Sequence, residues 1–255
     1  MSIFTGVGVA LVTVRDARDA PDVAATGALA ASLVARGMRA VLACGTTGEA
    51  GRLTDDQRAD VIAAVRKAVP RDVPVIAGTG AQSADRAAAL TSAAADAGAD
   101  AVLAWPPSDC EDLVGYYAAI GRAGSGLPAL AYHIPWVSAP GVPLEALADL
   151  PVVGIKDSSG DPDRLLFEVT RYSGATYVGS SALLALAGPI GCTGAILAVA
   201  NVAPELCTSA FAGDAQAQRE LTDTHLAVRA GGPPVLRKML AAESSGREPS
   251  TSAVS

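Results

Sequence analysis

Short apolar runs alternate with alanine-rich stretches along the whole 255-residue chain. The apolar runs are continuous rather than alternating with polar residues, which predicts parallel strands that are buried on both faces. Eight such runs, each followed by a helical stretch, predict an α/β protein whose strands close into a (β/α)8 TIM barrel, with a doubly wound sheet as the alternative. The predicted strands span residues 6–12, 40–44, 73–78, 101–105, 129–134, 152–156, 176–180 and 194–199.

Several stretches between the predicted strands carry signals for the start of a helix. Residues Thr54 to Gln57 have the form of a capping box, and Ser83 can cap the helix after the third strand. Asp161–Pro162 supplies a cap followed by a first-turn proline, and Pro143 predicts a similar helix start after the fifth strand. These signals place a helix after each of the strands concerned, as a barrel requires.

The composition is that of one compact globular domain. Half of the residues are hydrophobic, and the length suits a single large core. We assign residues 1–242 to the barrel and the polar residues 243–255 to a disordered tail. The net charge of −7, without a block of basic residues, argues against nucleic acid or an anionic membrane as a partner.

The sequence also indicates a cytoplasmic protein. The N-terminal apolar run lacks a basic leader and a small-residue cleavage site, so we interpret it as the first strand and not as a signal peptide. No apolar segment approaches the roughly 20 residues needed to span a bilayer. The four cysteines are scattered and form no CxxC pair, which favours reduced thiols.

Polar residues stand where four of the predicted strands end. In a barrel of this kind, the carboxyl ends of the strands form the active site. Groups that are far apart in the sequence should therefore converge on one face. The four segments are CGTTGE at 44–49, YHIP at 132–135, KDSSG at 156–160 and GSS at 179–181.

Lys156 stands out among the three lysines of the chain. Lys67 and Lys238 lie in helix-like stretches of mixed polarity, whereas Lys156 ends an apolar run. Apolar surroundings disfavour the charged form of an amine, and a neutral amine can attack a carbonyl to form a Schiff base. The alternative is that Lys156 pairs with Asp157 and merely ends the strand. Because neighbouring strand residues point to opposite faces, we expect Asp157 to be structural.

Two further segments complete a site for a 2-oxo acid. Thr46 and Thr47, in a glycine-flanked turn, offer hydroxyl and backbone N–H groups that can hold a carboxylate, although a plain βα turn has the same form. Tyr132 can transfer a proton through its phenol, although a packed core tyrosine is the alternative. Together these groups fit a 2-oxo acid. The amine can attack its carbonyl, the threonine turn can bind its carboxylate, and the phenol can transfer a proton.

The motifs GTTGE, YHIP and GIKDSSGD, in this order and on these strands, resemble those of the dihydrodipicolinate synthase / N-acetylneuraminate lyase family, the class I pyruvate-dependent aldolases. The likeness extends from about Phe4 to about Leu240. It implies that Lys156 forms the Schiff base, that Tyr132 is the general acid/base and that Thr46 belongs to its proton relay. It implies no metal and no organic cofactor, because the imine itself is the electron sink. The two histidines form no ligand pattern.

The resemblance also implies the residues that bind the substrate. Thr47 and the backbone at Gly48 would hold the carboxylate, and the carbonyl of Ile196 would lie near the imine. Ser180, at a strand end where many relatives have acidic residues, offers a hydroxyl to the substrate near the rim. It further implies a homo-oligomer, a dimer or a tetramer, that acts on a small 2-oxo acid and an aldehyde.

The sequence departs from the lysine-biosynthetic members of that family. Val137 stands where they carry an arginine for the carboxylate of the second substrate. Trp105 is followed by prolines where they have a tyrosine pair, and the next tyrosine is Tyr116, expected within a helix. The segment after Lys238 is short, so we expect a shortened C-terminal helical extension.

These departures favour a 2-keto-3-deoxy acid, most naturally a sugar acid, as the substrate of a carbon–carbon lyase. Trp136, Ser180 and Ser181 offer an apolar wall and neutral hydroxyl groups, which suit an uncharged or polyhydroxy aldehyde. The first alternative is a 4-hydroxy-tetrahydrodipicolinate synthase, which condenses pyruvate with aspartate semialdehyde. In that case Arg15 or Arg52 would have to reach the site.

Two readings from other classes remain. A non-catalytic barrel that binds a keto acid would explain the missing tyrosine pair. A dinucleotide fingerprint beginning at Gly78 is the weaker of the two, because Ser83 stands in place of its third glycine and Asp100 precedes the fourth strand instead of ending it.

Overall fold

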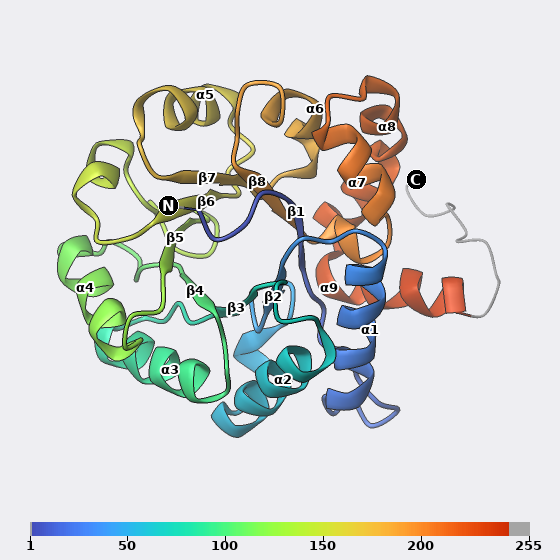
Figure 1. The fold of residues 1–255 in the computed structure, drawn as a ribbon, viewed down its shortest axis with the longest axis horizontal. Coiled ribbons are helices and arrows are strands. Elements are labelled where there is room, and N and C mark those ends of the chain that lie inside the picture. Colours follow the sequence, from blue (N-terminus) through green and yellow to red (C-terminus); the bar gives the residue numbers. More distant parts are fainter. Residues whose placement is uncertain (1, 245–255) are drawn as a thin grey trace.

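The computed structural model describes residues 2–244, and its eight parallel strands close into a barrel in chain order (Figure 1). The ladder between the last strand and the first closes the sheet, with Gly8 opposite Ile196. All eight predicted strands are confirmed, which excludes the doubly wound sheet. They are β1 (Gly6–Ala10), β2 (Val41–Ala43), β3 (Val75–Gly78), β4 (Ala101–Ala104), β5 (Ala129–His133), β6 (Gly154–Asp157), β7 (Ala175–Val178) and β8 (Gly194–Leu197).

Helices surround the barrel on the outside (Figure 1). After β5 the connection holds a 3-10 helix, Leu144–Asp149, that begins after Pro143, in place of the expected α-helix. The α-helices are α1 (Val23–Ala35), α2 (Asp55–Ala68), α3 (Ala84–Asp96), α4 (Leu113–Ala123), α5 (Pro162–Arg171), α6 (Leu184–Ala187), α7 (Pro204–Phe211), α8 (Ala215–Glu220) and α9 (Thr222–Ser244).

The predicted helix starts are confirmed by side-chain caps. Thr54 and Gln57 form the reciprocal capping box of α2. Ser83 caps α3, and Asp161 caps α5 with Pro162 in the first turn. Each cap satisfies backbone N–H groups that a helix start leaves without partners, so the sequence fixes these boundaries locally.

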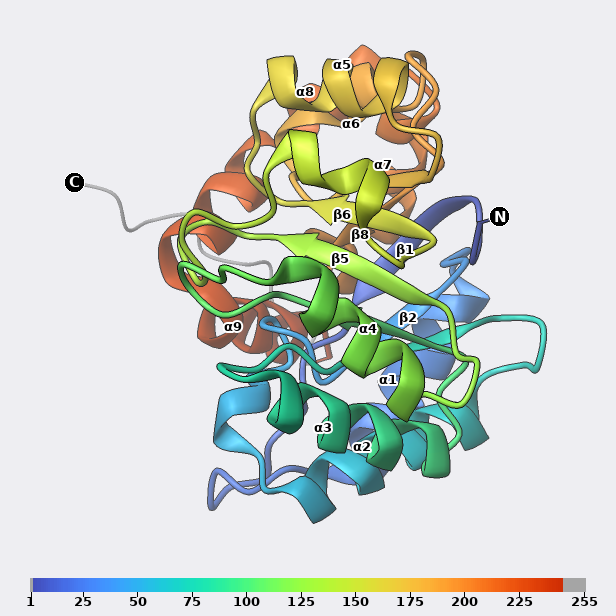
Figure 2. The same cartoon turned by 90° about the vertical axis from the view of Figure 1, so that its left-hand side faces the viewer.

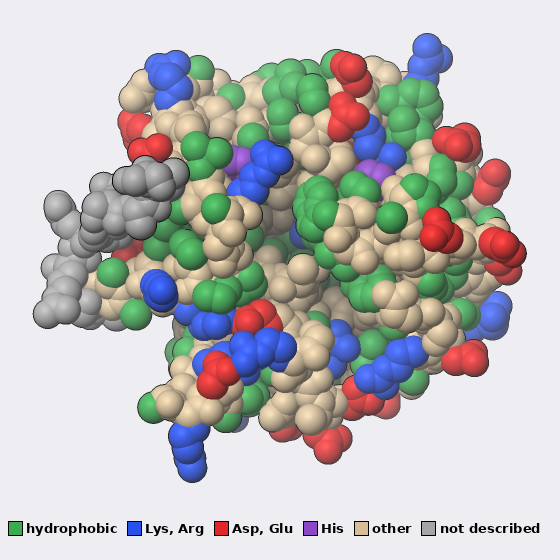
Figure 3. Space-filling model, turned by 180° about the vertical axis from the view of Figure 1, so that it is seen from behind, with side chains coloured by type: hydrophobic (Ala, Val, Ile, Leu, Met, Phe, Trp, Pro, Cys, Tyr) green, Lys and Arg blue, Asp and Glu red, His purple; other side chains and the backbone are tan. Residues whose placement is uncertain are grey.

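The last helix lies across the carboxyl ends of the strands (Figure 2). It is kinked at Gly232, whose φ of 60° and ψ of −150° are not helical, and Pro233 and Pro234 follow in the first turn of its second half. It continues to Ser244, two residues into the segment that we expected to be a tail; residues 245–255 lie outside the described part of the chain. Figure 3 looks onto this face, which is hollowed near its centre.

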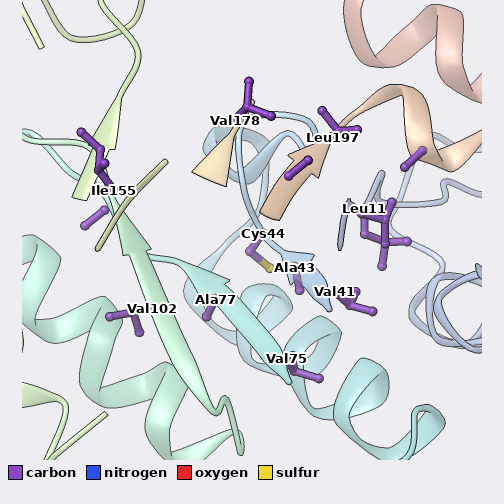
Figure 4. Close-up of a cluster of buried hydrophobic side chains, with 14 of the residues drawn as sticks. Leu11, Val41, Ala43, Cys44, Val75, Ala77, Val102, Ile155, Val178 and Leu197 are labelled. Atoms are coloured by element: carbon purple, nitrogen blue, oxygen red, sulfur yellow. The ribbon is translucent and has the colours of Figure 1, made fainter. Parts of the chain in front are cut away.

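Alternation along the strands produces two apolar layers. One layer, which includes Val41, Val102 and Ile155, packs against the helices, and Figure 4 shows part of it. The other contains Leu42, Tyr132 and other strand residues but no residue of an α-helix, so it fills the inside of the barrel. Because Lys156 alternates with Ile155, its side chain belongs to the inside. The register also sets Tyr132 opposite Lys156 on the neighbouring strands β5 and β6.

Candidate active site

A cavity of about 620 Å³ opens at the carboxyl ends of the strands. It joins segments from the β2, β5, β6, β7 and β8 ends of the barrel to the first and second halves of α9. Six of the seven predicted site residues line it: Thr46, Thr47, Tyr132, Lys156, Ser180 and Ile196. Tertiary structure thus brings together groups that are up to 150 positions apart, from 46 to 196.

Lys156 and Tyr132 are in contact at the bottom of the cavity. The Lys156 Nζ donates a hydrogen bond of 3.4 Å to the phenol oxygen of Tyr132 and lies 4.4 Å from the centre of its ring. Both side chains are buried, with 4% and 5% of their surface exposed. The ion pair with Asp157 that was the alternative for Lys156 is not formed: Asp157 points to the other side of β6 and accepts hydrogen bonds from the backbone and hydroxyl of Ser159.

Ser158 is a site residue that the sequence analysis missed. Its hydroxyl donates a 3.3 Å hydrogen bond to the same phenol oxygen of Tyr132, and it lines the cavity. The signal was present, because Ser158 stands two positions after Lys156 and so shares its face in an extended chain. Thr46 lines the cavity as well, but within residues 2–244 the hydrogen-bond partners of the phenol are Lys156 and Ser158.

The GTTGE loop has an unusual backbone at both ends. Cys44 and Glu49 have positive φ values of 54° and 52°, which are uncommon for residues with a side chain and are typical of functional loops. Thr46 and Thr47 thereby line the cavity. Gly48 lies behind it: its carbonyl accepts a hydrogen bond from Thr13, and an added Cβ would lie 3.1 Å from the Leu11 carbonyl. Gly48 is not among the residues that line the cavity, and its part in holding the carboxylate stays a prediction.

Arginines hold the carboxylate of Glu49 in place. Arg52 forms a 3.0 Å ion pair with it, Arg15 lies 3.6 Å away, and Arg237 of α9 donates a short hydrogen bond to it. These contacts lower the pKa of Glu49 against the opposing effect of burial, and they join the loop to the second half of α9. Arg15 and Arg52 also contact Asp19 and do not line the cavity. Neither is the cation that we considered for a second substrate carboxylate.

The cation in the outer part of the cavity comes from α9 instead. His225, Val228 and Arg229 of its first half line the cavity, together with residues at the kink. The Ser181 hydroxyl lies 2.8 Å from His225 Nδ1, and burial, together with the charge of Arg229, lowers the pKa of this histidine. No motif in the sequence marked these residues, because their place depends on how α9 folds back over the barrel.

The outer wall of the cavity carries Trp136, with 64% of its surface exposed. The neighbouring Val137 does not line the cavity but packs against the inner core, so this position supplies no charge. Tyr116 lies within α4 as predicted. Its hydroxyl donates a 2.8 Å hydrogen bond to the Trp105 carbonyl, which makes it a support of the β4 loop rather than a member of the site.

Buried ionisable groups stand behind β6, on the side away from the cavity. Arg164 lies 2.9 Å from Glu168 and 3.7 Å from Asp157. Burial, followed by the charge of Asp157, raises the pKa of Glu168 to about 8, and burial also raises the pKa of Asp157. His133 faces the same cluster, and burial together with the Arg164 charge lowers its pKa to about 4.

Two absences complete the description of the chain from 2 to 244. No helix in this part is long and apolar enough to cross a membrane. No group of three or more His, Cys, Asp or Glu side chains there is arranged to hold a metal ion.

Comparison with known proteins identifies the family. The model of the dihydrodipicolinate synthetase family matches residues 3–230. An uncharacterized DapA-like lyase of Halobacterium salinarum is 37% identical over 238 residues, which cover 88% of this chain and 78% of that protein. A 4-hydroxy-tetrahydrodipicolinate synthase of Pseudomonas aeruginosa is 35% identical over 235 residues, covering 87% and 80%. The crystal structure of dihydrodipicolinate synthase from Acinetobacter baumannii complexed with pyruvate superposes with a TM-score of 0.83 at 27% identity, covering 97% of this chain and 90% of that one.

The chain belongs to the dihydrodipicolinate synthetase family, as its motifs indicated. Members of this family are class I aldolases, which act through a lysine Schiff base. The protein is therefore a carbon–carbon lyase of this class and not a non-catalytic keto-acid-binding barrel.

Proposed function

We propose that Lys156 forms the imine and that the enzyme cleaves a 2-keto-3-deoxy acid, of the sugar-acid kind, to pyruvate and an aldehyde. The observation that carries this proposal is the 3.4 Å hydrogen bond between Lys156 and Tyr132, buried at the bottom of a cavity whose walls bear hydroxyl groups. A buried amine next to a phenol combines a nucleophile with a proton-transfer group. The imine serves as the electron sink, so the proposal needs no further cofactor.

The residues divide the reaction between them. The amine of Lys156 attacks the 2-oxo carbon and water leaves, while Thr47 and the GTTG turn hold the adjoining carboxylate. Tyr132 gives its phenol proton to the oxygen that departs as water, and the phenolate then removes the proton of the hydroxyl on C4. The C3–C4 bond breaks, and the aldehyde leaves. The electron pair forms an enamine, which takes a proton at C3 and is then hydrolysed to pyruvate and free Lys156. Ser158, which donates a hydrogen bond to the phenol oxygen, keeps the phenol oriented between these steps, and Thr46 lies in the same cavity.

The role of Lys156 is tested by trapping the imine. Sodium borohydride added with pyruvate should leave a stable mass adduct on Lys156, and Lys156→Ala should abolish both the adduct and turnover. Lys156→Arg should be equally inactive, because a guanidinium stays protonated. Lys238→Ala, at an exposed position of α9, is the control and should keep full activity. An adduct on Lys67 or Lys238 would refute the assignment.

Condensation of pyruvate with aspartate semialdehyde is the second candidate. Relatives with 34–37% identity include several named 4-hydroxy-tetrahydrodipicolinate synthase, and Arg229 supplies a cation that the sequence analysis had not placed in the cavity. We favour the 2-keto-3-deoxy acid because Ser158, Ser180 and Ser181 present neutral hydroxyls suited to a hydroxylated chain. Side-by-side kcat/KM values decide between them. Equal or higher kcat/KM with aspartate semialdehyde would reverse our choice.

We further propose that the enzyme is a cytoplasmic homo-oligomer, a dimer or a tetramer. All four cysteines are free, three of them buried, which suits a reducing compartment. Leu166 and Phe167 of α5 and Leu186 of α6 are large apolar side chains exposed on neighbouring helices, as at a subunit contact. Analytical ultracentrifugation tests the oligomer, and a monomer at micromolar concentration would contradict it.

A further inference from the structure

The balance of charge in the cavity differs from that of the whole protein. The chain carries a net charge of −7, yet the described residues that line the cavity include Lys156 and Arg229 and no aspartate or glutamate. Formation of the imine occupies the amine of Lys156. Arg229 then remains as the cationic side chain available for a second, distant part of the substrate.

Arg229 is held toward the cavity by the geometry of α9. His225 and Arg229 are four residues apart, so they share one face of the helix, and both line the cavity. The Ser181 hydroxyl, 2.8 Å from His225 Nδ1, ties this face to the end of β7. The lowered pKa of His225 leaves the ring neutral near pH 7, so it adds hydrogen-bonding capacity without competing with Arg229 for an anion.

The other arginines on this face are already paired. Arg15, Arg52 and Arg237 contact Glu49, and the first two also contact Asp19. Within the described part of the chain, no carboxylate lies at ion-pair distance from Arg229. Its side chain is exposed at the rim, so an anion that enters the cavity can reach it.

We propose that Arg229 binds an anionic group, a carboxylate or a phosphate, at the far end of the substrate's aldehyde half. This inference rests on the proposed imine at Lys156 and narrows the substrate to a 2-keto-3-deoxy acid with a second anionic end. It replaces the expectation of an uncharged aldehyde, which assumed that no cation faces the cavity. The guanidinium suits either anion, because its planar donors match carboxylate and phosphate oxygens alike.

The first test compares two 2-oxo acids of equal length that differ in the charge of their far end. The concentration of 2-oxoadipate or 2-oxohexanoate is varied in the presence of borohydride. The amount of adduct trapped on Lys156 is measured by mass spectrometry. We expect half-maximal trapping at about tenfold lower concentration for 2-oxoadipate, because one charge-assisted contact is gained. Arg229→Gln should remove most of this preference.

Matched variants distinguish a specific contact of Arg229 with the anion from a general effect of positive charge on α9. Arg229→Lys should keep part of the preference, and Lys238→Gln, which removes an exposed charge of the same helix outside the cavity, should keep all of it. The preference should also shrink as salt is raised, because an exposed pair is screened. A wild type with no preference, or an Arg229→Gln variant that keeps it, would overturn the inference. Loss of the pyruvate adduct from Lys156 in the wild type would instead refute the proposed function.

A second arm distinguishes the two anions. Retro-aldol cleavage is measured for 2-keto-3-deoxygluconate, for its 6-phosphate, and for the related acid that carries a carboxylate at C6. The anionic substrate with the higher kcat/KM identifies the class, and the advantage should fall in Arg229→Gln. Cleavage of 2-keto-3-deoxygluconate at a rate equal to both anionic forms would contradict the assignment.

Discussion

A single glycine decides where the lysine of the site can lie. Gly179, at the end of β7, lines the cavity, and a Cβ added there would overlap the Ser158 hydroxyl and lie 3.0 Å from Cε of Lys156. The missing side chain therefore leaves the space in which Lys156 and Ser158 both reach the phenol of Tyr132. This requirement comes from packing between β6 and β7 and not from the conformational freedom of glycine.

Tyr132 and Thr47 should separate catalysis from binding when each is replaced. Tyr132→Phe keeps the ring that packs in the inner core but removes the phenol, so kcat should fall by about 10²–10⁴-fold with little change in the affinity for pyruvate. Thr47→Val removes a donor from the carboxylate cradle and should mainly raise KM. Steady-state kinetics with the cleaved substrate, and imine trapping with pyruvate, measure the two effects. The same modest loss in both variants would mean that Tyr132 is a core residue only.

At the scale of elements, α9 and the GTTGE loop support each other. Arg237 of α9 contacts Glu49 of the loop, and the kink at Gly232 directs the first half of α9 toward the cavity. The backbone at Gly232 has φ of 60° and ψ of −150°, a combination open to glycine and strained for other residues. The position is not crowded, because a Cβ there would meet nothing within 4 Å.

Gly232→Ala should therefore lower the free energy of unfolding by about 1–3 kcal/mol through backbone strain alone. Because the kink sets the position of Arg229, the preference for an anionic 2-oxo acid should fall in the same variant. Urea denaturation measures the first effect and imine trapping the second. Gly121→Ala is the matched control: it lies within α4, also has open space around its Cβ, and has helical backbone, so it should be neutral or slightly stabilising. If the two variants had the same free energy of unfolding and the same preference for the anionic acid, the kink would not be the cause of either property.

At the scale of the whole molecule, the barrel separates two kinds of ionisable groups. Those inside face the cavity, whereas Asp157, Arg164 and Glu168 are buried between β6 and α5. This buried cluster contains two acidic side chains and one basic side chain. The negative charge of each carboxylate therefore disfavours ionisation of the other. Burial, followed by the charge of Asp157, raises the pKa of Glu168 to about 8.

This cluster should make stability depend on pH. The folded pKa of Glu168 lies above the value of 4.5 for the free side chain, so the folded state binds the extra proton between these two values. The free energy of unfolding should therefore fall as the pH rises from about 4.5 through about 8, by at most about 1.4 kcal/mol per pH unit. Denaturation at pH 6 and pH 9 measures it. Glu168→Gln should flatten the difference, whereas Glu205→Gln, which removes a surface partner of Arg36, should leave it unchanged. A wild type equally stable at both values would contradict the prediction.

Much of the fold could be predicted because it depends on local chemistry. The continuous apolar runs gave all eight strands, and Thr54, Ser83 and Asp161 gave helix starts through caps that involve only their neighbours. The sixth strand was predicted over residues 152–156, whereas β6 spans Gly154–Asp157. The helix expected after Pro143 is a 3-10 helix, because local signals specify a turn but not how it packs.

The residues at the bottom of the cavity could also be predicted from the sequence. A barrel places the carboxyl ends of its strands on one face, and the motifs stand at those ends. Lys156, Tyr132, Thr46 and Thr47 do line one cavity. The residues in the outer part of the cavity could not be predicted from the sequence. Arg229 and His225 lie on a helix that follows the last strand. Their position depends on the kink at Gly232 and on the contact of Arg237 with Glu49, which is 188 residues away in the sequence. The sequence by itself determines the base of the cavity, because the strands and the residues that end them follow from local patterns and the barrel fold brings those ends together. The path of α9 over the cavity results from long-range packing, so only the tertiary structure decides which charged side chain faces the substrate.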